Sequence, residues 1–168
     1  MGRLVNLEEL ERITTELKSQ GSTICFANGH FDLLHVGHLR YLQAARAEGD
    51  VLVVGLNGDG SVERLKGPGR PLVPAVERAE MLAALEPVDF IVVFDDDTPA
   101  DVLRRLRPQV HCKGTDYETP EKVPEFEVVR AYGGRTVLLG DPKDHSTRDL
   151  ISSARELDRV AGDRVAGD

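Results

Sequence analysis

The sequence contains no long apolar run and only two cysteines. No stretch approaches the roughly 18 apolar residues of a membrane-spanning helix, and residues 1–9 lack the apolar core of a signal peptide. Cys25 and Cys112 each lie in an apolar, strand-like run, which favours buried reduced thiols over a disulfide. These absences predict a cytoplasmic protein with no membrane contact.

An excess of positive charge is also missing. The 21 Lys and Arg residues are outnumbered by 29 Asp and Glu residues, which gives a formal net charge of −8. Nucleic-acid-binding domains carry a basic surface, so this balance argues against a nucleic acid as the main partner. It leaves room for a small anionic substrate, which needs only a local basic pocket.

Two common nucleotide-binding motifs are absent as well. The sequence has no Gly-x-x-x-x-Gly-Lys-Ser/Thr loop, which argues against an ordinary P-loop kinase. It also has no Gly-x-Gly-x-x-Gly fingerprint, so dinucleotide-dependent redox chemistry has no support.

What the sequence does contain is a stretch from Asn28 to Arg40 where a strand-like run gives way to a helical pattern. The first turn of a helix has unpaired N–H groups and a partial positive charge, so it attracts phosphate. Gly37 lets a phosphate approach the backbone, and His35 and His38 add two imidazoles. This arrangement predicts a cradle for a polyphosphate substrate. A metal-binding pair and two plain surface histidines are the alternatives, although no third metal ligand follows at a familiar spacing.

Around this stretch, strand-like and helical patterns alternate along a chain whose 168 residues suit one domain. Asn6 and Glu9 form a capping-box pattern at the start of an amphipathic helix over residues 7–20. Such alternation predicts an α/β fold with a doubly wound, parallel five-stranded sheet, and a frayed tail over residues 158–168. The strands are expected at residues 23–27, 51–56, 90–94, 110–112 and 136–139, and the later helices at 37–48, 75–85, 99–107, 125–132 and from 146 onwards. In the helix over residues 75–85, Met81, Leu82 and Leu85 are expected to face inward.

Right-handed crossovers place the carboxyl ends of parallel strands at one edge of the sheet, where ligands bind. Several polar or basic turns are expected to converge there and to hold a nucleoside triphosphate. They are the cradle, residues 57–59, the basic loop 66–71, the turn 113–117 and the helix start at 145–149. The acidic run at residues 95–97 is either a set of solvated loop charges or part of a metal site.

These blocks together resemble the nucleotidyltransferase superfamily of the His-x-Gly-His type, which includes the cytidylyltransferases. Within it, the sequence is most similar to the D-glycero-β-D-manno-heptose 1-phosphate adenylyltransferases. The similarity covers residues 20–152 and implies a Rossmann-like nucleotidyltransferase fold. The matching motifs are Asn28-Gly-His-Phe-Asp32, His35-Val-Gly-His38, Arg64-Leu-Lys-Gly-Pro-Gly-Arg-Pro71, Arg78-Ala-Glu80, Phe94-Asp-Asp-Asp-Thr-Pro99 and Lys113-Gly-Thr-Asp-Tyr117.

The resemblance implies a reaction in which ATP and heptose 1-phosphate, with Mg²⁺, give ADP-heptose and pyrophosphate for lipopolysaccharide-type sugar incorporation. Positioning and electrostatic stabilisation then supply most of the rate. Catalytic roles fall to His35, His38 and Lys66. Nucleotide contacts are expected from His30, Phe31, Gly37, Arg78, Ser146, Thr147 and Arg148. Substrate contacts are expected from Asp32, Arg70, Lys113 and Asp116.

Two residues depart from the family pattern. His30 replaces the usual cysteine of the first motif, and Arg148 replaces the second threonine of a final Ser-Thr-Thr motif. These changes bear on the choice of base and acceptor more than on the reaction type. The alternatives are a cytidylyltransferase acting on an alcohol phosphate such as glycerol 3-phosphate, and a non-catalytic nucleotide-binding regulator. A homodimer is one arrangement open to such a domain.

Overall fold

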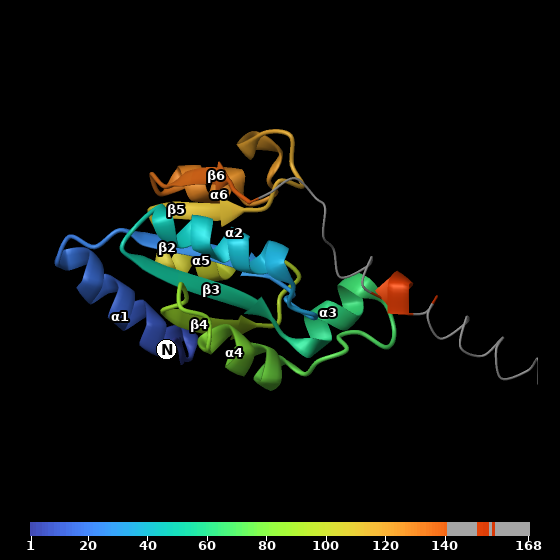
Figure 1. The fold of residues 1–168 in the computed structure, drawn as a ribbon. Coiled ribbons are helices and arrows are strands. Elements are labelled where there is room, and N and C mark those ends of the chain that lie inside the picture. Colours follow the sequence, from blue (N-terminus) through green and yellow to red (C-terminus); the bar gives the residue numbers. More distant parts are fainter. Residues whose placement is uncertain (141–150, 155, 157–168) are drawn as a thin grey trace, which may run out of the picture.

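A parallel sheet lies at the centre of the computed structural model, which describes residues 1–140, 151–154 and 156 (Figure 1). Six strands among these residues lie in the order β1-β4-β3-β2-β5-β6, and every neighbouring pair is parallel. Helices cover both faces, so the predicted doubly wound α/β class is confirmed. The strands are β1 Arg3–Leu4, β2 Ile24–Gly29, β3 Val51–Asn57, β4 Phe90–Phe94, β5 Val110–Lys113 and β6 Arg135–Leu138.

The prediction of five strands was one short, because the sequence gives no signal for β1. This strand has only two residues and pairs with β4, with Arg3 opposite Phe90. The Val5 N–H adds a hydrogen bond to the Ile91 carbonyl just beyond it. Two residues are too few to show an alternating pattern, so tertiary pairing alone makes this segment a strand.

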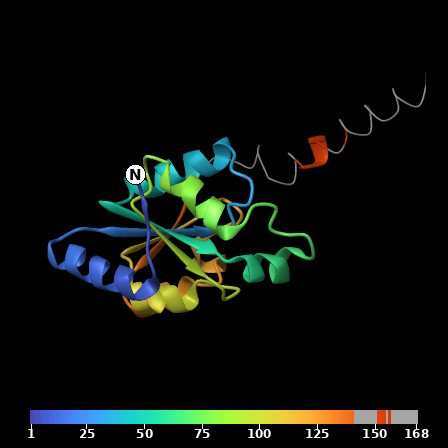
Figure 2. The same ribbon diagram turned by 90° about the horizontal axis from the view of Figure 1, so that it is seen from below.

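The helices pack in two layers. Leu42 of α2 and Leu82 of α4 are buried on one face, and Leu10 of α1, Leu103 of α5 and Val129 of α6 are buried on the other (Figure 2). The helices are α1 Leu7–Ser19, α2 Val36–Ala47, α3 Asp59–Lys66, α4 Ala75–Ala83, α5 Ala100–Leu106 and α6 Phe126–Ala131, with a 3-10 turn, η1, at Pro120–Lys122. The predicted cap of α1 is present, since the Glu9 N–H donates to Asn6 Oδ1 over 2.9 Å.

The sequence missed one helix and misjudged the inward face of another. Helix α3 was not predicted, because Gly58 and Gly60 make its beginning read as a turn. On α4, Met81 was expected to face the core but is 38% exposed, whereas Arg78 is fully buried. Ala79 and Leu82 provide the apolar contact instead, so the helix is rotated relative to the expectation.

The centre of the sheet is tightly packed. Gly55 of β3 lies opposite Asn28 of β2. A Cβ on Gly55 would overlap the ring of Phe26 and lie 3.3 Å from the Asn28 Cβ. The absence of a side chain therefore lets these two strands and their side chains approach one another.

The strand order reverses at β2, which lies between β3 and β5. In doubly wound sheets, ligands bind in the crevice at the carboxyl ends of the strands on either side of such a switch point. Here that crevice begins at Gly29 of β2 and Lys113 of β5. The residues that follow these two strands are therefore the first candidates for a ligand-binding site.

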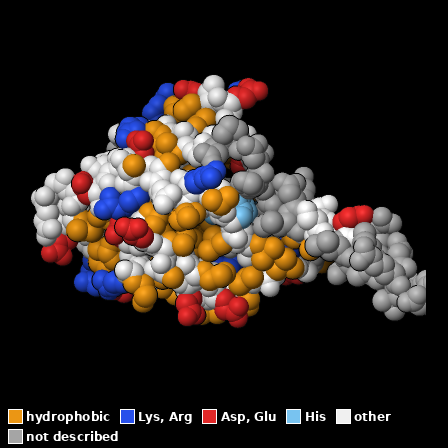
Figure 3. All heavy atoms as spheres, viewed as in Figure 1, with side chains coloured by type: hydrophobic (Ala, Val, Ile, Leu, Met, Phe, Trp, Pro, Cys, Tyr) orange, Lys and Arg blue, Asp and Glu red, His pale blue; other side chains and the backbone are white. Residues whose placement is uncertain are grey.

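Other predictions can be compared with the described part of the chain. Cys25 and Cys112 are buried and free, as expected. None of the described helices is both long and apolar enough to cross a bilayer. On the face drawn in Figure 3, charged side chains of both signs are scattered between apolar groups. The predicted helix start at Ser146, Thr147 and Arg148, and the tail over residues 158–168, lie outside the described residues.

Candidate active site

The predicted cradle forms where β2 is followed by α2. His35 has an extended backbone (φ −143°) and caps the helix, which begins at Val36, one residue earlier than expected. The N–H groups of His38 and Leu39 donate to the His35 carbonyl over 2.9 and 3.3 Å. The N–H groups of Val36 and Gly37 come before the first hydrogen bonds within the helix, so they point out of its N-terminal end. This is the geometry that binds phosphate.

The two histidines of the cradle lie against each other. Their rings stack with centroids 3.9 Å apart, and the ring of Phe31 lies 5.2 Å from that of His38. Burial, followed by the proximity of His35, lowers the pKa of His38 to about 4. His38 is therefore neutral at pH 7 and carries one N–H donor.

Phe31 has an unusual backbone conformation that places its ring under His38. Its φ is 46°, in the left-handed region, which bulky residues seldom occupy. Gly29 makes room for the ring, since a Cβ there would lie 3.1 Å from it. Phe31 is 3% exposed. Its main contact is thus with the histidine, and little of its surface is left for the nucleotide contact that the sequence predicts.

His30 marks the place where several predicted site residues meet. Its pKa is lowered to about 4, first by burial and then by the positive charges of Lys66 and Arg78. Lys113 lowers it further, and Asp32 opposes the effect. Since Lys66, Arg78 and Lys113 come from α3, α4 and β5, three segments distant in sequence meet the loop after β2 around one imidazole.

The basic loop after α3 is attached to the first motif through Asp32. Lys66 is the last residue of α3, and Gly67 ends that helix with a φ of 95°. Asp32 Oδ1 accepts the N–H groups of Leu72 and Val73 over 2.7 and 3.0 Å. Asp32 Oδ2 lies 2.8 Å from Arg70 Nη1. Asp32 therefore fixes the loop, a role that the sequence did not reveal when it suggested contact with the substrate.

Arg78 is fully buried, and its guanidinium links several segments of the chain. Its Nε donates to the Val73 carbonyl over 2.8 Å, and its Nη1 donates to the carbonyls of Asn57 and His30. Its Nη2 donates to the Asp59 carboxylate over 2.7 Å. The end of β3, the segment before α4 and the His30 backbone thus all bond to this guanidinium, and the nucleotide contact of Arg78 stays a prediction.

Across the switch point, Lys113 ends β5. Its Nζ lies 3.5 Å from Asn28 Oδ1, 3.8 Å from Glu125 Oε2 and 5.7 Å from the centre of the Tyr117 ring. Burial lowers the pKa of Lys113, while Glu125 and Asp116 oppose the shift. Asp116 itself is exposed. Lys113 therefore faces the same edge as His30, with a carboxylate beside it.

One buried residue near this edge escaped prediction. His111 of β5 is fully buried, and its Nε2 lies 3.2 Å from Asn28 Oδ1. In the sequence it appears only as a polar residue within a short apolar run. Its partner lies 83 residues earlier in the chain, so only the pairing of β2 with β5 brings the two together.

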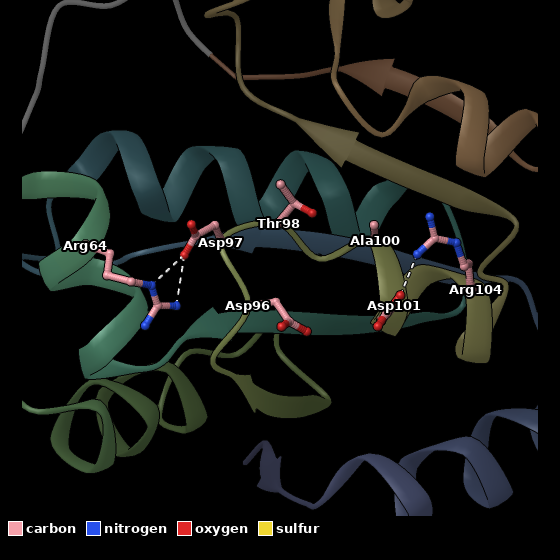
Figure 4. Close-up of a pocket in the computed structure, with 7 residues that line it drawn as sticks. All are labelled: Arg64, Asp96, Asp97, Thr98, Ala100, Asp101 and Arg104. Carbon is pink, nitrogen blue, oxygen red and sulfur yellow. Dashed lines mark hydrogen bonds and ion pairs between the residues drawn. The ribbon is translucent and has the colours of Figure 1, made fainter.

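A separate pocket of about 510 Å³ lies where β4 is followed by α5 (Figure 4). None of the predicted site residues lines it, and four of its five charged side chains form ion pairs. Arg64 pairs with Asp97 and also donates to the Asp95 carbonyl, and Arg104 pairs with Asp101. Within the acidic run, Asp97 is thus neutralised by an arginine. The lining residues are Arg64, Asp96, Asp97, Thr98, Ala100, Asp101 and Arg104.

The described residues do not offer a protein cage for a divalent metal. No group of three or more His, Cys, Asp or Glu side chains among them is placed to hold one. Mg²⁺ prefers several oxygen ligands, whereas the cradle provides imidazole nitrogens and ammonium groups. The groups at this edge are instead backbone N–H groups, neutral imidazoles and cations, which are the kinds of group that bind anions.

Comparisons with known proteins agree with this geometry. A family model described as cytidylyltransferase-like matches residues 26–155. The bifunctional protein HldE of Geotalea uraniireducens (strain Rf4) is 52% identical over 153 residues, which are 91% of this chain and 31% of that protein. The bifunctional protein HldE of Gluconobacter oxydans (strain 621H) is 47% identical over 150 residues, 89% of this chain and 31% of that protein. The chain thus spans about a third of the length of the curated relatives it matches.

Solved structures share the fold at lower identity. The lipopolysaccharide core biosynthesis protein from Thermoplasma volcanium GSS1 has a TM-score of 0.62 and 24% identity, covering 73% of this chain and 100% of that one. The pantoate-beta-alanine ligase from Francisella tularensis, complexed with ATP and beta-alanine, has a TM-score of 0.61 and 14% identity, covering 92% of this chain and 77% of that one. Because the family model spans most of the chain, the predicted resemblance is confirmed, and the chain belongs to the cytidylyltransferase-like family.

Proposed function

We propose that this chain transfers the adenylyl group of ATP to the phosphate of heptose 1-phosphate and releases pyrophosphate. The observation that carries the proposal is the convergence of Lys66 and Lys113 on His30, beside the histidine pair at the start of α2. The switch point provides the crevice, and about 50% identity to the bifunctional relatives supports a shared reaction. The motif Arg64-Leu-Lys-Gly-Pro-Gly-Arg-Pro71 favours a heptose phosphate as acceptor.

In this reaction, an oxygen of the sugar phosphate attacks the α-phosphorus of ATP. A new phosphorus–oxygen bond forms as the bond to the bridging oxygen breaks, and pyrophosphate leaves with that electron pair. Negative charge shifts toward the leaving group, so donors fixed in advance stabilise the transition state. Mg²⁺ enters as part of the nucleotide substrate, bound by its phosphate oxygens.

The histidine pair and the N–H groups at the start of α2 are assigned to the triphosphate. Within the described residues, the buried His38 Nδ1 has no hydrogen-bond partner, which leaves Nε2 as the nitrogen facing a ligand. A neutral imidazole donates from that nitrogen without a prior change of protonation. His35 is assigned the same role beside it.

The cations are assigned to the reacting phosphates. Lys66 is the last residue of α3, and its long, flexible side chain can follow the α-phosphate as charge shifts. Arg70 lies close to Asp32, but the pair is not aligned as a hydrogen bond, and Arg70 Nη1 has no other partner in the described part. A phosphate oxygen of the acceptor would provide one. Lys113 and Asp116 are assigned to the sugar side, and Ser146, Thr147 and Arg148 to the nucleotide phosphates.

The test is the release of pyrophosphate by the purified chain with each of four substrate pairs. ATP or CTP is combined with heptose 1-phosphate or with glycerol 3-phosphate. Turnover only with ATP and heptose 1-phosphate is expected. Turnover with CTP and glycerol 3-phosphate would replace the proposal by an alcohol-phosphate cytidylyltransferase. Tight ATP binding with no pyrophosphate from any pair would indicate a nucleotide-binding regulator. The free, buried thiols suit the reducing cytoplasm as the place of action.

A further inference from the structure

His111 and Asn28 are joined across the switch point of the sheet. In the pairing of β2 with β5, Phe26 lies opposite His111 and Ala27 opposite Cys112. Asn28 is therefore the diagonal neighbour of His111 on the same face, since side chains two residues apart on a strand share a face. The rings of Phe26 and His111 lie 6.1 Å apart, and His111 Nε2 reaches Asn28 Oδ1 over 3.2 Å.

The chemistry of the two groups decides which one donates. Burial, followed by the positive charge of Lys113, lowers the pKa of His111 to about 3, so its ring is neutral near pH 7. A carboxamide oxygen can only accept a hydrogen bond. The single ring proton is thus on Nε2, and His111 donates to Asn28. Within the described residues, His111 Nδ1 is buried and has no hydrogen-bond partner.

This hydrogen bond fixes the direction of the Asn28 side chain. Lys113 Nζ lies 3.5 Å from the same oxygen, so two donors of β5 hold Oδ1 toward that strand. The NH₂ branch of the carboxamide must then point away from β5. Asn28 precedes His30 by two residues at the carboxyl end of β2, where the crevice begins.

We propose that His111 is a positioning residue that turns the NH₂ group of Asn28 toward the anionic substrate in the crevice. The inference rests on the proposed nucleotidyl transfer for the identity of that substrate. His111 itself does not touch the substrate, because it is fully buried. Its effect passes through Asn28, whose NH₂ group is a neutral donor at the carboxyl end of β2.

A role limited to stability would not suit this residue. The buried His111 Nδ1 without a partner costs free energy, and its removal offsets the loss of the hydrogen bond to Asn28 Oδ1, which keeps Lys113 as a donor. His111→Leu is therefore expected to hold or raise the melting temperature while it lowers activity. A merely structural histidine would lose both together.

The experiment compares three variants. His111→Leu removes the donor, and His111→Gln keeps an N–H group in reach of Asn28. Thr136→Val is the matched control, because Thr136 lies opposite His111 on β6 and its buried Oγ1 has no partner in the described part. We expect kcat/KM to fall about three- to tenfold in His111→Leu, the size of one net hydrogen bond, to recover largely in His111→Gln, and to stay unchanged in Thr136→Val.

A double variant tests the route through Asn28. If His111 acts through Asn28, adding His111→Leu to Asn28→Ala should cause no further loss of kcat/KM. An additional loss of the full size, or equal falls of activity and melting temperature in His111→Leu, would overturn the proposal.

Side-chain NH₂ signals in ¹⁵N NMR spectra separate this inference from the proposed function. The Asn28 signals should shift in His111→Leu but not in Thr136→Val, even if no pyrophosphate is formed. Unshifted Asn28 signals would also overturn it.

Discussion

At the scale of single residues, burial sets the protonation of the site. His30 and His38 both have a pKa lowered to about 4, so neither carries a charge near pH 7. The fixed positive charge of the crevice comes instead from Lys66 and Lys113. In the proposed reaction the two tasks are separate: cations attract the triphosphate, and neutral imidazoles donate hydrogen bonds to it.

His38→Ala is expected to lower kcat about 10²- to 10³-fold, the usual loss when one transition-state donor is removed. Steady-state pyrophosphate release with ATP and heptose 1-phosphate measures it. Since Phe31 packs against His38, His38→Gln serves as the control that keeps bulk and an N–H group. Near wild-type turnover in His38→Ala would remove this residue from the reaction.

Arg78→Lys is expected to destabilise the fold by about 3–5 kcal/mol, the cost of leaving buried partners of a charged group unpaired. Lysine lacks the planar fork that reaches four acceptors in different directions. Urea denaturation measures the loss. A variant with unchanged stability and weakened ATP binding would instead favour the nucleotide contact that the sequence predicts.

At the scale of elements, the basic loop is held by the same motif that leads into the cradle. Asp32 follows β2, and it accepts two N–H groups of the segment before α4. Any shift of the first motif therefore moves Arg70 as well. This coupling explains why an aspartate that resembles a substrate ligand in the sequence is 5% exposed in the structure.

Asp32→Asn should show this coupling. The amide removes the charge that faces Arg70 and should cost about 2 kcal/mol of stability, as for a buried donor that loses its partner. It should also raise KM for the sugar phosphate, because Arg70 loses the charge that holds it, while the asparagine oxygen can still accept the two N–H groups. Asp97→Asn is the matched control, since its ion pair with Arg64 is about half exposed. Equal effects of the two substitutions would refute the anchoring role.

Sequence reasoning was reliable for elements with a clear period and weak for those defined by tertiary contacts. The strands β2, β3, β4 and β6 and the cradle at α2 were placed within one or two residues, because their apolar runs are bounded by turn residues. Helix α3 was missed because its two glycines read as a turn, and β1 was missed because it has only two residues. The convergence of charges on His30 followed from parallel topology alone. The roles of Arg78 and His111 could not be predicted, since their partners are distant in sequence.

At the scale of the whole molecule, one buried and two half-buried histidines link stability to pH. His30, His38 and His111 have folded-state pKa values of about 4, 4 and 3, below the ordinary 6.5. Between these values the unfolded chain binds more protons than the folded one, so stability is lost as the pH falls. The loss begins near pH 6.5 and continues to about pH 3.

Thermal melting of the protein at pH 7.5, 6.0 and 5.0 tests this linkage. The melting temperature should fall steadily below pH 6.5, and it should fall less steeply in His111→Leu, which lacks one of the three groups. Thr136→Val should keep the wild-type slope. A melting temperature that stays constant to pH 5.0 would show that these imidazoles are solvated in the folded state.

The close approach of β2 and β3 at Gly55 limits how the protein can be redesigned. Even alanine there would push against Phe26 and toward Asn28, and so disturb both the ring that packs on His111 and the amide at the crevice. A library that seeks a new acceptor specificity should therefore diversify the basic loop and the turn after β5, and keep Gly55 constant. Surviving clones should retain glycine at that position even when it is deliberately randomised.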